Sequence, residues 1–153
     1  MRWLRVGMTL LAVSMMSTLA MAQDDALAAA QAALEEYFRA WNAEDNAALT
    51  AVSNFPRLSL GRNGQVVVRD DPEDIETDFD LLKQVEGWDH STLDLVETVQ
   101  VSSDTVHFKV VFSRRHDDGT AYRTVPALFV ITSQNGHWGL QLQSMLPTTF
   151  QGP

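Results

Sequence analysis

The sequence predicts an α+β fold in which a cone-shaped, strongly curved antiparallel sheet wraps around three N-terminal helices. Two observations point to this class. The N-terminal part of the chain has apolar residues at helical spacing, whereas the C-terminal part has four long β-prone runs joined by short polar turns. The chain has 153 residues, a length that fits one domain and leaves little room for two.

The first 22 residues have the pattern of a secretory signal peptide. Two arginines form a positive n-region, residues 6–19 form an apolar h-region, and residues 20–22 read A-M-A, which fits an A-x-A cleavage site. An uncleaved anchor is the alternative, but the apolar run is shorter than the roughly 20 residues that span a bilayer. We therefore expect a periplasmic or secreted protein whose single domain, residues 23–153, keeps no stable membrane anchor after cleavage.

Three helices are expected before the long strands. The first begins near Asp24, whose charge suits a helix N-terminus, and carries one apolar stripe. The second is short, is capped by Asp45 and is ended by Pro56, because the residue before a proline avoids helical backbone angles. The third begins at Asp71, which is followed by a proline and acidic residues, and it ends at Gly87.

Six strands are expected, and their alternation predicts which faces are buried. Val106, Phe108, Val110 and Phe112 share the inward face of one strand, whereas the run 125–131 is apolar on both faces and cannot be oriented. The expected strands are 57–60 and 65–69, which form an early hairpin, and then 92–101, 104–116, 121–133 and 137–146. In the last strand, simple alternation places Gln141 and Gln143 on the outer face, where they could lie in a dimer interface.

Composition excludes several classes of function. The chain has no cysteine, which rules out a disulfide scaffold, a thiol enzyme and a thiolate zinc site. A formal net charge of -9 argues against nucleic-acid binding. No phosphate loop, nucleophile elbow or metal-binding histidine pair is present, so we expect neither a cofactor nor a metal. The acidic run from Asp70 to Asp80 could bind a cation or a basic partner, or it could be a solvated helix face.

Two segments carry a resemblance to a known group. They are YFRAWNAED at residues 37–45, followed by a short helix, and NGHWGL at residues 135–140 in the closing strand. Together they resemble the nuclear-transport-factor-2-like (NTF2-like) superfamily, and within it the SnoaL-like group, over essentially all of residues 23–153. The resemblance implies a bent sheet around helices with a pocket between them. Members include isomerases, dehydratases, cyclases and epoxide hydrolases, and also binding or association modules without chemistry.

Ketosteroid isomerase is the most informative member of that superfamily for comparison. Its chemistry needs a helix-1 tyrosine, a carboxylic acid on a later strand and a carboxylate on the first strand. Tyr37 matches the tyrosine by its spacing to Asp45, but residues 57–61 and 125–128 contain no carboxylate. The resemblance therefore leaves the proton-transfer base and one oxyanion donor without a counterpart.

The remaining candidates come from residue chemistry. His90 is suited to proton transfer near neutral pH, although its neighbour Asp89 would point to the opposite face of a regular strand. Arg114 continues an inward face and could either clamp an anion or pair with a nearby acid. Trp41, Phe55 and Trp88 are core residues or aromatic lining of a pocket mouth. The predicted ligand-binding set is Tyr37, Trp41, Phe55, Trp88, His90, Phe112 and Arg114.

These observations favour a protein that binds a small, partly apolar molecule between helices and sheet and pairs as a homodimer through the outer sheet face. One alternative is a metal-independent lyase, isomerase or cyclase in which Tyr37 and His90 perform general acid–base catalysis. Another is an envelope protein-interaction module that uses the outer sheet face or the acidic helix.

Overall fold

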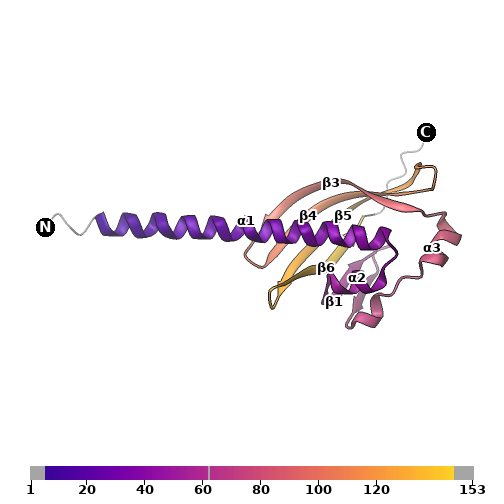
Figure 1. Cartoon of the computed structure of the whole chain (residues 1–153), viewed down its shortest axis with the longest axis horizontal. Coiled ribbons are helices and arrows are strands. Elements are labelled where there is room, and N and C mark those ends of the chain that lie inside the picture. The colour runs from indigo at the N-terminus through magenta and orange to yellow at the C-terminus, as the bar shows by residue number, and fades with distance from the viewer. Residues whose placement is uncertain (1–5, 62, 147–153) are drawn as a thin grey trace.

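The computed structural model describes residues 6–61 and 63–146, and these form one α+β unit with all helices on the concave side of one sheet (Figure 1). The elements in chain order are α1 (Val6–Asn42), α2 (Asn46–Ala51), β1 (Ser53–Leu60), β2 (Val66–Arg69), the 3-10 helix η1 (Pro72–Ile75), α3 (Phe79–Glu86), β3 (His90–Val101), β4 (Thr105–Arg115), β5 (Ala121–Gln134) and β6 (His137–Met145).

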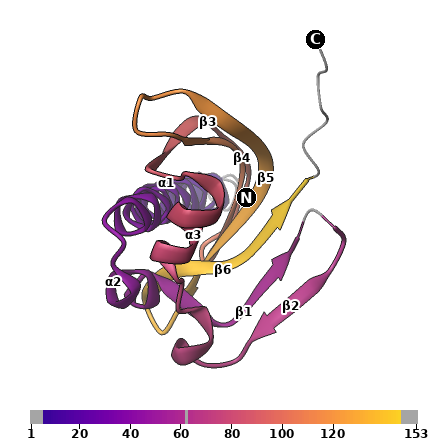
Figure 2. The same ribbon diagram turned by 90° about the vertical axis from the view of Figure 1, so that its right-hand side faces the viewer.

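The six strands form one sheet in the order β2-β1-β6-β5-β4-β3. Strands β3 to β6 make the expected antiparallel meander, and the sheet curves around α1 (Figure 2). The expectation of a wholly antiparallel sheet is wrong in one place, because β1 runs parallel to β6 and the sheet is mixed. The early hairpin β1–β2 joins the meander along the free edge of β6, so β1 lies beside the last strand of the chain.

Gly139 permits this junction between β1 and β6. The Leu140 N–H donates to the Val52 carbonyl at 2.8 Å, which docks β6 onto the chain between α2 and β1. A Cβ atom at Gly139 would lie 2.9 Å from the carbonyl carbon of Ser53 and 3.1 Å from the Asn54 nitrogen. These neighbours are backbone atoms that cannot move aside, so the close approach requires glycine at this position.

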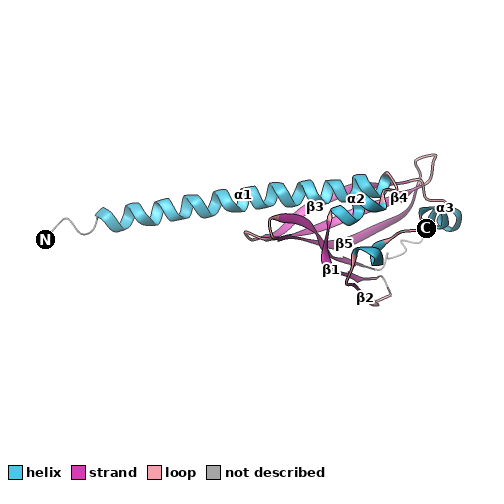
Figure 3. Cartoon of the chain, turned by 60° about the horizontal axis from the view of Figure 1, so that its bottom comes forward, coloured by secondary structure: helices cyan, strands magenta, loops and turns pink. Residues whose placement is uncertain are grey.

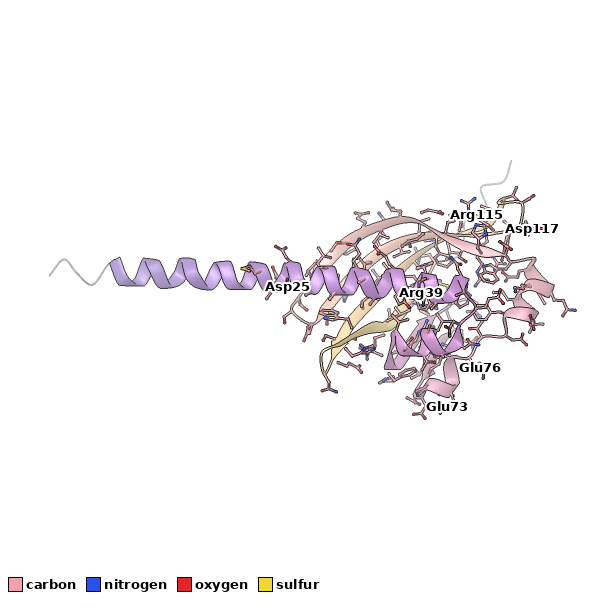
Figure 4. All side chains as sticks on the ribbon, viewed as in Figure 1. Asp25, Arg39, Glu73, Glu76, Arg115 and Asp117 are labelled. Carbon is pink, nitrogen blue, oxygen red and sulfur yellow. The ribbon has the colours of Figure 1, made fainter. Side chains whose placement is uncertain are left out.

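Helix α1 differs from the expectation at its start. It runs without a break from Val6 to Asn42, whereas a beginning near Asp24 was expected. No glycine or proline interrupts the alanine-rich sequence 8–42, so nothing in it stops the helix. The sheet covers only its second half: Ala26 and Ala30 are buried, and the labelled Asp25 lies where α1 leaves the sheet (Figures 3 and 4). Within the described residues, we find no helix with the length and apolar character needed to cross a membrane.

The second and third helices also differ from the expectation. Helix α2 ends at Ala51, and Pro56 lies inside β1 instead of ending a helix. The expected third helix is split into η1 and α3, because each part has its own cap. The Asp74 carboxylate accepts the Asp71 backbone N–H at η1, and the Asp78 carboxylate accepts the Leu81 N–H at the start of α3. Gly87 ends α3 in the left-handed region, as expected.

The core lies between α1 and the concave face of the sheet. The expected inward face of β4 is confirmed, since all four of its residues are buried. The orientation of β5 is now resolved, because Val125, Ala127, Phe129 and Ile131 point inward. Phe38 of α1 packs edge-on against Phe112 at a centroid distance of 5.7 Å. Each large apolar side chain buried in this way stabilises the fold by about 1.5–3 kcal/mol.

A β-bulge in β6 changes which side chains face inward. Leu140 pairs with Ile131 and Leu142 pairs with Val130, so Gln141 is an extra residue on the β6 side. One extra residue reverses the alternation that follows it. Gln143 consequently faces the concave side, and its expected position on the outer face is wrong.

One carboxylate anchors α3 to the sheet. Glu86 accepts hydrogen bonds from Arg114 Nη1 at 2.6 Å, from Arg123 Nη1 at 2.7 Å and from the Tyr122 hydroxyl at 2.8 Å. Burial would raise the pKa of Glu86, but the three hydrogen bonds outweigh it and lower the pKa from 4.5 to about 2. Burial, followed by the adjacent carboxylate, raises the pKa of Tyr122 to about 12.

We expect Glu86→Gln to lower the free energy of unfolding at pH 7 and to flatten its acid dependence. A group with a depressed folded-state pKa stabilises the fold above its ordinary pKa, and that contribution is lost as pH falls from about 4.5 to about 2. The full shift corresponds to about 3 kcal/mol, and partial solvation reduces our expectation to about 1–2 kcal/mol. Urea unfolding between pH 7 and pH 2 measures this difference.

The matched control is Glu97→Gln, which removes the carboxylate of an exposed ion pair with Lys109 and should cost less than about 1 kcal/mol. If the stability curves of wild type and Glu86→Gln stay parallel from pH 7 to pH 2, the assignment of the acid dependence to Glu86 is wrong.

Candidate functional site

A cavity of about 70 Å³ lies between the C-terminal half of α1 and the concave face of the sheet; we call it the aromatic cavity. Helix α1 supplies aromatic side chains at helical spacing, and the inward positions of β4 and β5 supply two more. Its lining residues are Tyr37, Phe38, Trp41, Ser91, Phe112, Arg114, Phe129, Gln143 and Met145.

A second cavity of about 130 Å³ shares the walls formed by Tyr37, Trp41 and Gln143; we call it the arginine cavity. The hairpin β1–β2 and the segment around η1 close its other side. The residues that line only this cavity are Leu49, Arg57, Ser59, Arg69, Ile75 and Thr77. The two cavities therefore lie side by side, one mainly aromatic and the other bearing two guanidinium groups.

Two asparagines fix the helices around these cavities. Asn42, the last residue of α1, accepts the Ser91 N–H and donates to the Ser91 carbonyl, both at 2.8 Å. Asn46, the first residue of α2, makes the same pair of hydrogen bonds with Thr77, both at 3.0 Å. These paired bonds hold the end of α1 to β3 and hold α2 to the segment before α3.

Arg57 is the most unusual residue of the site, because it is a buried cation without a carboxylate partner. Only 6% of its surface is exposed. Its guanidinium donates to the Ser53 hydroxyl at 3.2 Å, the Tyr37 hydroxyl at 3.2 Å and Gln143 Oε1 at 3.0 Å. Among residues 6–61 and 63–146, its buried Nε has no hydrogen-bond partner and no carboxylate forms an ion pair with the guanidinium.

The strand register explains why two arginines meet here. Arg57 and Ser59 point inward from β1, while Leu58 between them points outward. Arg69 of β2 lies directly opposite Arg57 in the antiparallel pair, so both side chains are on the same face. Arg69 donates to the Ser59 hydroxyl and to the Asp74 backbone carbonyl, both at 3.1 Å, and forms no ion pair with a described carboxylate.

Four of the seven sequence-predicted residues line the aromatic cavity: Tyr37, Trp41, Phe112 and Arg114. Tyr37 is buried and its hydroxyl separates this cavity from Arg57. Arg114 lies over the Trp41 ring at 5.9 Å, and its charge is already balanced by Glu86. Of the two roles considered for Arg114, the structure places it in an ion pair.

The other three predicted residues do not line either cavity. Trp88 is buried behind the wall, where it packs on Phe79 and donates to the Ser91 hydroxyl at 3.0 Å. Phe55 lies in β1 away from both cavities. The His90 ring is hydrogen-bonded to Asp89 at 2.8 Å and is partly exposed. This pair forms because Asp89 precedes the regular strand, whereas the strand geometry expected from sequence would have kept the two side chains apart.

Sequence reasoning missed Arg57, Arg69, Gln143 and Met145. The expected strand 57–60 was too short to show a clear alternation. With the observed start of β1 at Ser53, alternation with Leu58 would have indicated that Arg57 points inward. Gln143 and Met145 could not be found by alternation, because the bulge at Gln141 reverses it.

The linings of the two cavities combine aromatic, uncharged polar and cationic side chains. Neither cavity is lined by an aspartate, a glutamate or a histidine of the described chain. Within that part of the chain no group of three or more histidine or acidic residues could hold a metal ion. What the cavities offer is aromatic surface, the Tyr37 hydroxyl, the Gln143 amide and a guanidinium pair.

Comparisons with known proteins agree with this fold. A protein from Streptomyces avermitilis, a proposed dehydratase of the NTF2-like family, is 14% identical with a TM-score of 0.63 and covers 82% of this chain and 98% of its own. A ketosteroid isomerase-like protein from Erwinia carotovora atroseptica is 18% identical with a TM-score of 0.59 and covers 80% and 96%. A Catenulispora acidiphila protein in complex with S-DNPA is 11% identical with a TM-score of 0.60 and covers 80% and 95%.

At these identities the solved structures show the fold alone. No curated protein sequence matches the chain. A family model described as NTF2-like protein (DUF6841) matches residues 24–144, which is most of the chain. The match begins near the point where the sheet starts to cover α1 (Figure 1). The chain therefore belongs to this NTF2-like family.

Proposed function

We propose that this protein binds a small, partly apolar molecule between the helices and the sheet. The observation that carries the proposal is the aromatic cavity, an apolar hollow with few polar groups, which is the usual composition of a ligand site. Tyr37 and Gln143 offer hydrogen bonds to a molecule in it, and Phe112 and Phe129 offer apolar contact.

The size of the cavities limits the ligand. An engineered apolar cavity of about 150 Å³ holds one benzene molecule. The aromatic cavity, at about 70 Å³, is roughly half that size, and the arginine cavity, at about 130 Å³, approaches it. A ligand of this protein is therefore a short chain or a single ring, and a ring needs more space than the aromatic cavity alone provides.

The enzymatic alternative has little support from the site. Tyr37 lies in the cavity wall, but His90 lies outside it and is paired with Asp89, so the two do not face one reacting molecule. The names of the similar structures do not change this, because their identities are low. The acidic version of an interaction module also lacks a favouring observation, since Asp74 and Asp78 accept backbone hydrogen bonds at helix starts.

Export forms a second part of the proposal. The leader pattern of residues 1–22 supports it, and so does the start of the family match at residue 24. Residues 21–25 are exposed, whereas Ala26 begins the buried face of α1. Removal of the leader would thus leave the core intact and would place Asp24 and Asp25 at a helix N-terminus, where negative charge is favourable.

Pairing into a homodimer through the outer sheet face is the third part. Leu58 is directly paired with Val68 on one side and Leu142 on the other, and Leu142 is paired with Val130. These four residues form an apolar row across four strands on the convex face. Val68 is 52% exposed and the other three are partly exposed. A second copy would cover such a row, because monomers rarely leave contiguous apolar surface exposed.

For ligand binding we expect Met145→Trp to weaken capture of p-cresol and 1-hexanol at least ten-fold, because the larger side chain fills the aromatic cavity. Two-dimensional NMR titration of the mature protein measures the affinity, and the amide shifts should cluster around Phe112 and Phe129. Leu146→Trp is the control, since Leu146 is the next residue and 56% exposed.

Equal binding by wild type and Met145→Trp, with both variants folded by thermal melting, would place the ligand elsewhere. Native mass spectrometry of protein purified from a periplasmic extract adds a second readout, because a retained molecule should leave on unfolding.

For export we expect the full chain, expressed in a Gram-negative host, to accumulate in the periplasm with an intact mass that begins at Gln23. Replacement of the last small residue, Ala22→Leu, should block processing and leave the leader attached. Recovery of wild-type protein at the full-chain mass would contradict the proposed cleavage.

For assembly we expect the mature protein to sediment as a dimer and Leu58→Glu to sediment as a monomer, because the substitution places a charge within the apolar row. Val85→Glu is the control: Val85 lies on α3, is 72% exposed and is not part of the row. Analytical ultracentrifugation at micromolar concentration separates the two states. An unchanged dimer in Leu58→Glu would remove this face from the interface.

A further inference from the structure

We infer that the ligand is an organic acid whose carboxylate binds Arg57 and Arg69 in the arginine cavity. The inference rests on the proposed function and deepens it, because it assigns the ligand a charged end and places that end in the fold. The apolar part of the same molecule would lie toward Tyr37 and Trp41, which form the wall shared with the aromatic cavity.

The first step of the argument is the cost of burying Arg57. A guanidinium removed from water needs a counter-charge, and buried charges in proteins are normally paired. Arg57 is almost completely buried, yet its three protein acceptors are two hydroxyls and one amide oxygen, all uncharged. Its Nε has no acceptor at all within the described residues. The Tyr37 ring, whose centroid lies 5.1 Å from Arg57 Cζ, gives a cation–π contact. Within the described residues no carboxylate balances the charge, and an anion in the cavity would do so.

The second step is the position of Arg69. Like charges directly opposite each other on neighbouring strands are unfavourable, and Arg69 lies opposite Arg57. Neither arginine forms an ion pair with a described carboxylate, although the chain carries 20 acidic residues against 11 basic ones. Two cations lining one small cavity in an acidic protein mark the place where a negative ligand is most favourable.

A comparison with Arg114 sharpens this point. Arg114 also reaches the interior of the cone, and Glu86 neutralises it at 2.6 Å. The chain thus provides a carboxylate for one inward arginine and none for the other. A structural role accounts for Arg114, whereas Arg57 lines the arginine cavity and, within the described residues, has neither a carboxylate partner nor an acceptor for its buried Nε.

The third step concerns the chemical class of the anion. A guanidinium presents parallel N–H donors that match a carboxylate. The Tyr37 hydroxyl accepts from Arg57 and donates to no described residue, so its proton is available to a carboxylate oxygen. The remaining walls include Leu49, Ile75 and Trp41, which an inorganic anion would leave uncovered. An organic acid with a short chain or a single ring uses both kinds of wall.

The experiment compares acids with their uncharged amides. We expect hexanoate and phenylacetate to bind the mature protein at least ten-fold more tightly than hexanamide and phenylacetamide at pH 7, as measured by isothermal titration calorimetry. Arg69→Gln, at the partly exposed side of the cavity, should weaken acid binding at least ten-fold and weaken amide binding much less, because only the acid carries a charge. The same loss is expected for Arg57→Gln.

Arg39→Gln is the matched control, because Arg39 is an exposed arginine on α1 that pairs with Glu36. It should bind the acids as wild type does. If Arg57→Gln does not fold, as judged by circular dichroism and thermal melting, Arg69→Gln decides the question alone. Inorganic phosphate serves as a competitor and should displace the acids only weakly, since it lacks an apolar part.

The outcomes separate this inference from the proposed function. Equal affinity for acids and amides, sensitive to Met145→Trp, would overturn the carboxylate assignment and leave the proposed ligand site standing. Acid binding that persists in Arg69→Gln and in folded Arg57→Gln would also overturn the assignment. Absence of acid binding at millimolar concentration would overturn it as well, and binding of p-cresol would then decide the proposed function independently.

Discussion

The close approach of β6 to the chain between α2 and β1 is the constraint on which the rest of this structure depends. It requires Gly139, because any side chain there would collide with the backbone of Ser53 and Asn54. Once the two segments meet, the Leu140 N–H bonds the Val52 carbonyl and β1 continues parallel to β6. Without this contact the hairpin β1–β2 would have no edge to join. The wall that carries Arg57 would then be absent from the cone.

The bulge in β6 completes that wall. Trp138 and Leu140, before the bulge, point into the core, and Gln143, after it, brings an amide to the point where both cavities meet. A regular strand would have placed Leu142 inside instead, and the interior would have been apolar from end to end. Because of the extra residue, the interior contains the Gln143 amide, which accepts a hydrogen bond from Arg57, in place of the Leu142 side chain. Bulges next to functional sites commonly have this effect.

The sequence predicts the parts of the fold that follow from local rules. The inward face of β4 follows from strict alternation ending at Phe112, and the end of α3 follows from Gly87. Two features depend on contacts that no local pattern encodes: the parallel β1–β6 pair and the inward turn of Gln143. The aromatic half of the site follows from the helical stripe that includes Tyr37. Its cationic half also needs the β1–β2 register that pairs Arg57 with Arg69 and the bulge that turns Gln143 inward.

The surface of the protein and the interior of the cone differ in charge. The chain is acidic overall, and its described carboxylates lie outside both cavities. An anion approaching the protein is repelled by its net negative charge, yet this repulsion is largely screened beyond about 8 Å in physiological salt. Inside the cone, where screening is weaker, the two arginines dominate the local field. If the ligand is the organic acid that we infer, this contrast would favour molecules with a single negative group and an apolar remainder. The aromatic wall would contact the apolar part of such a molecule, and Arg57 would bind its negative group.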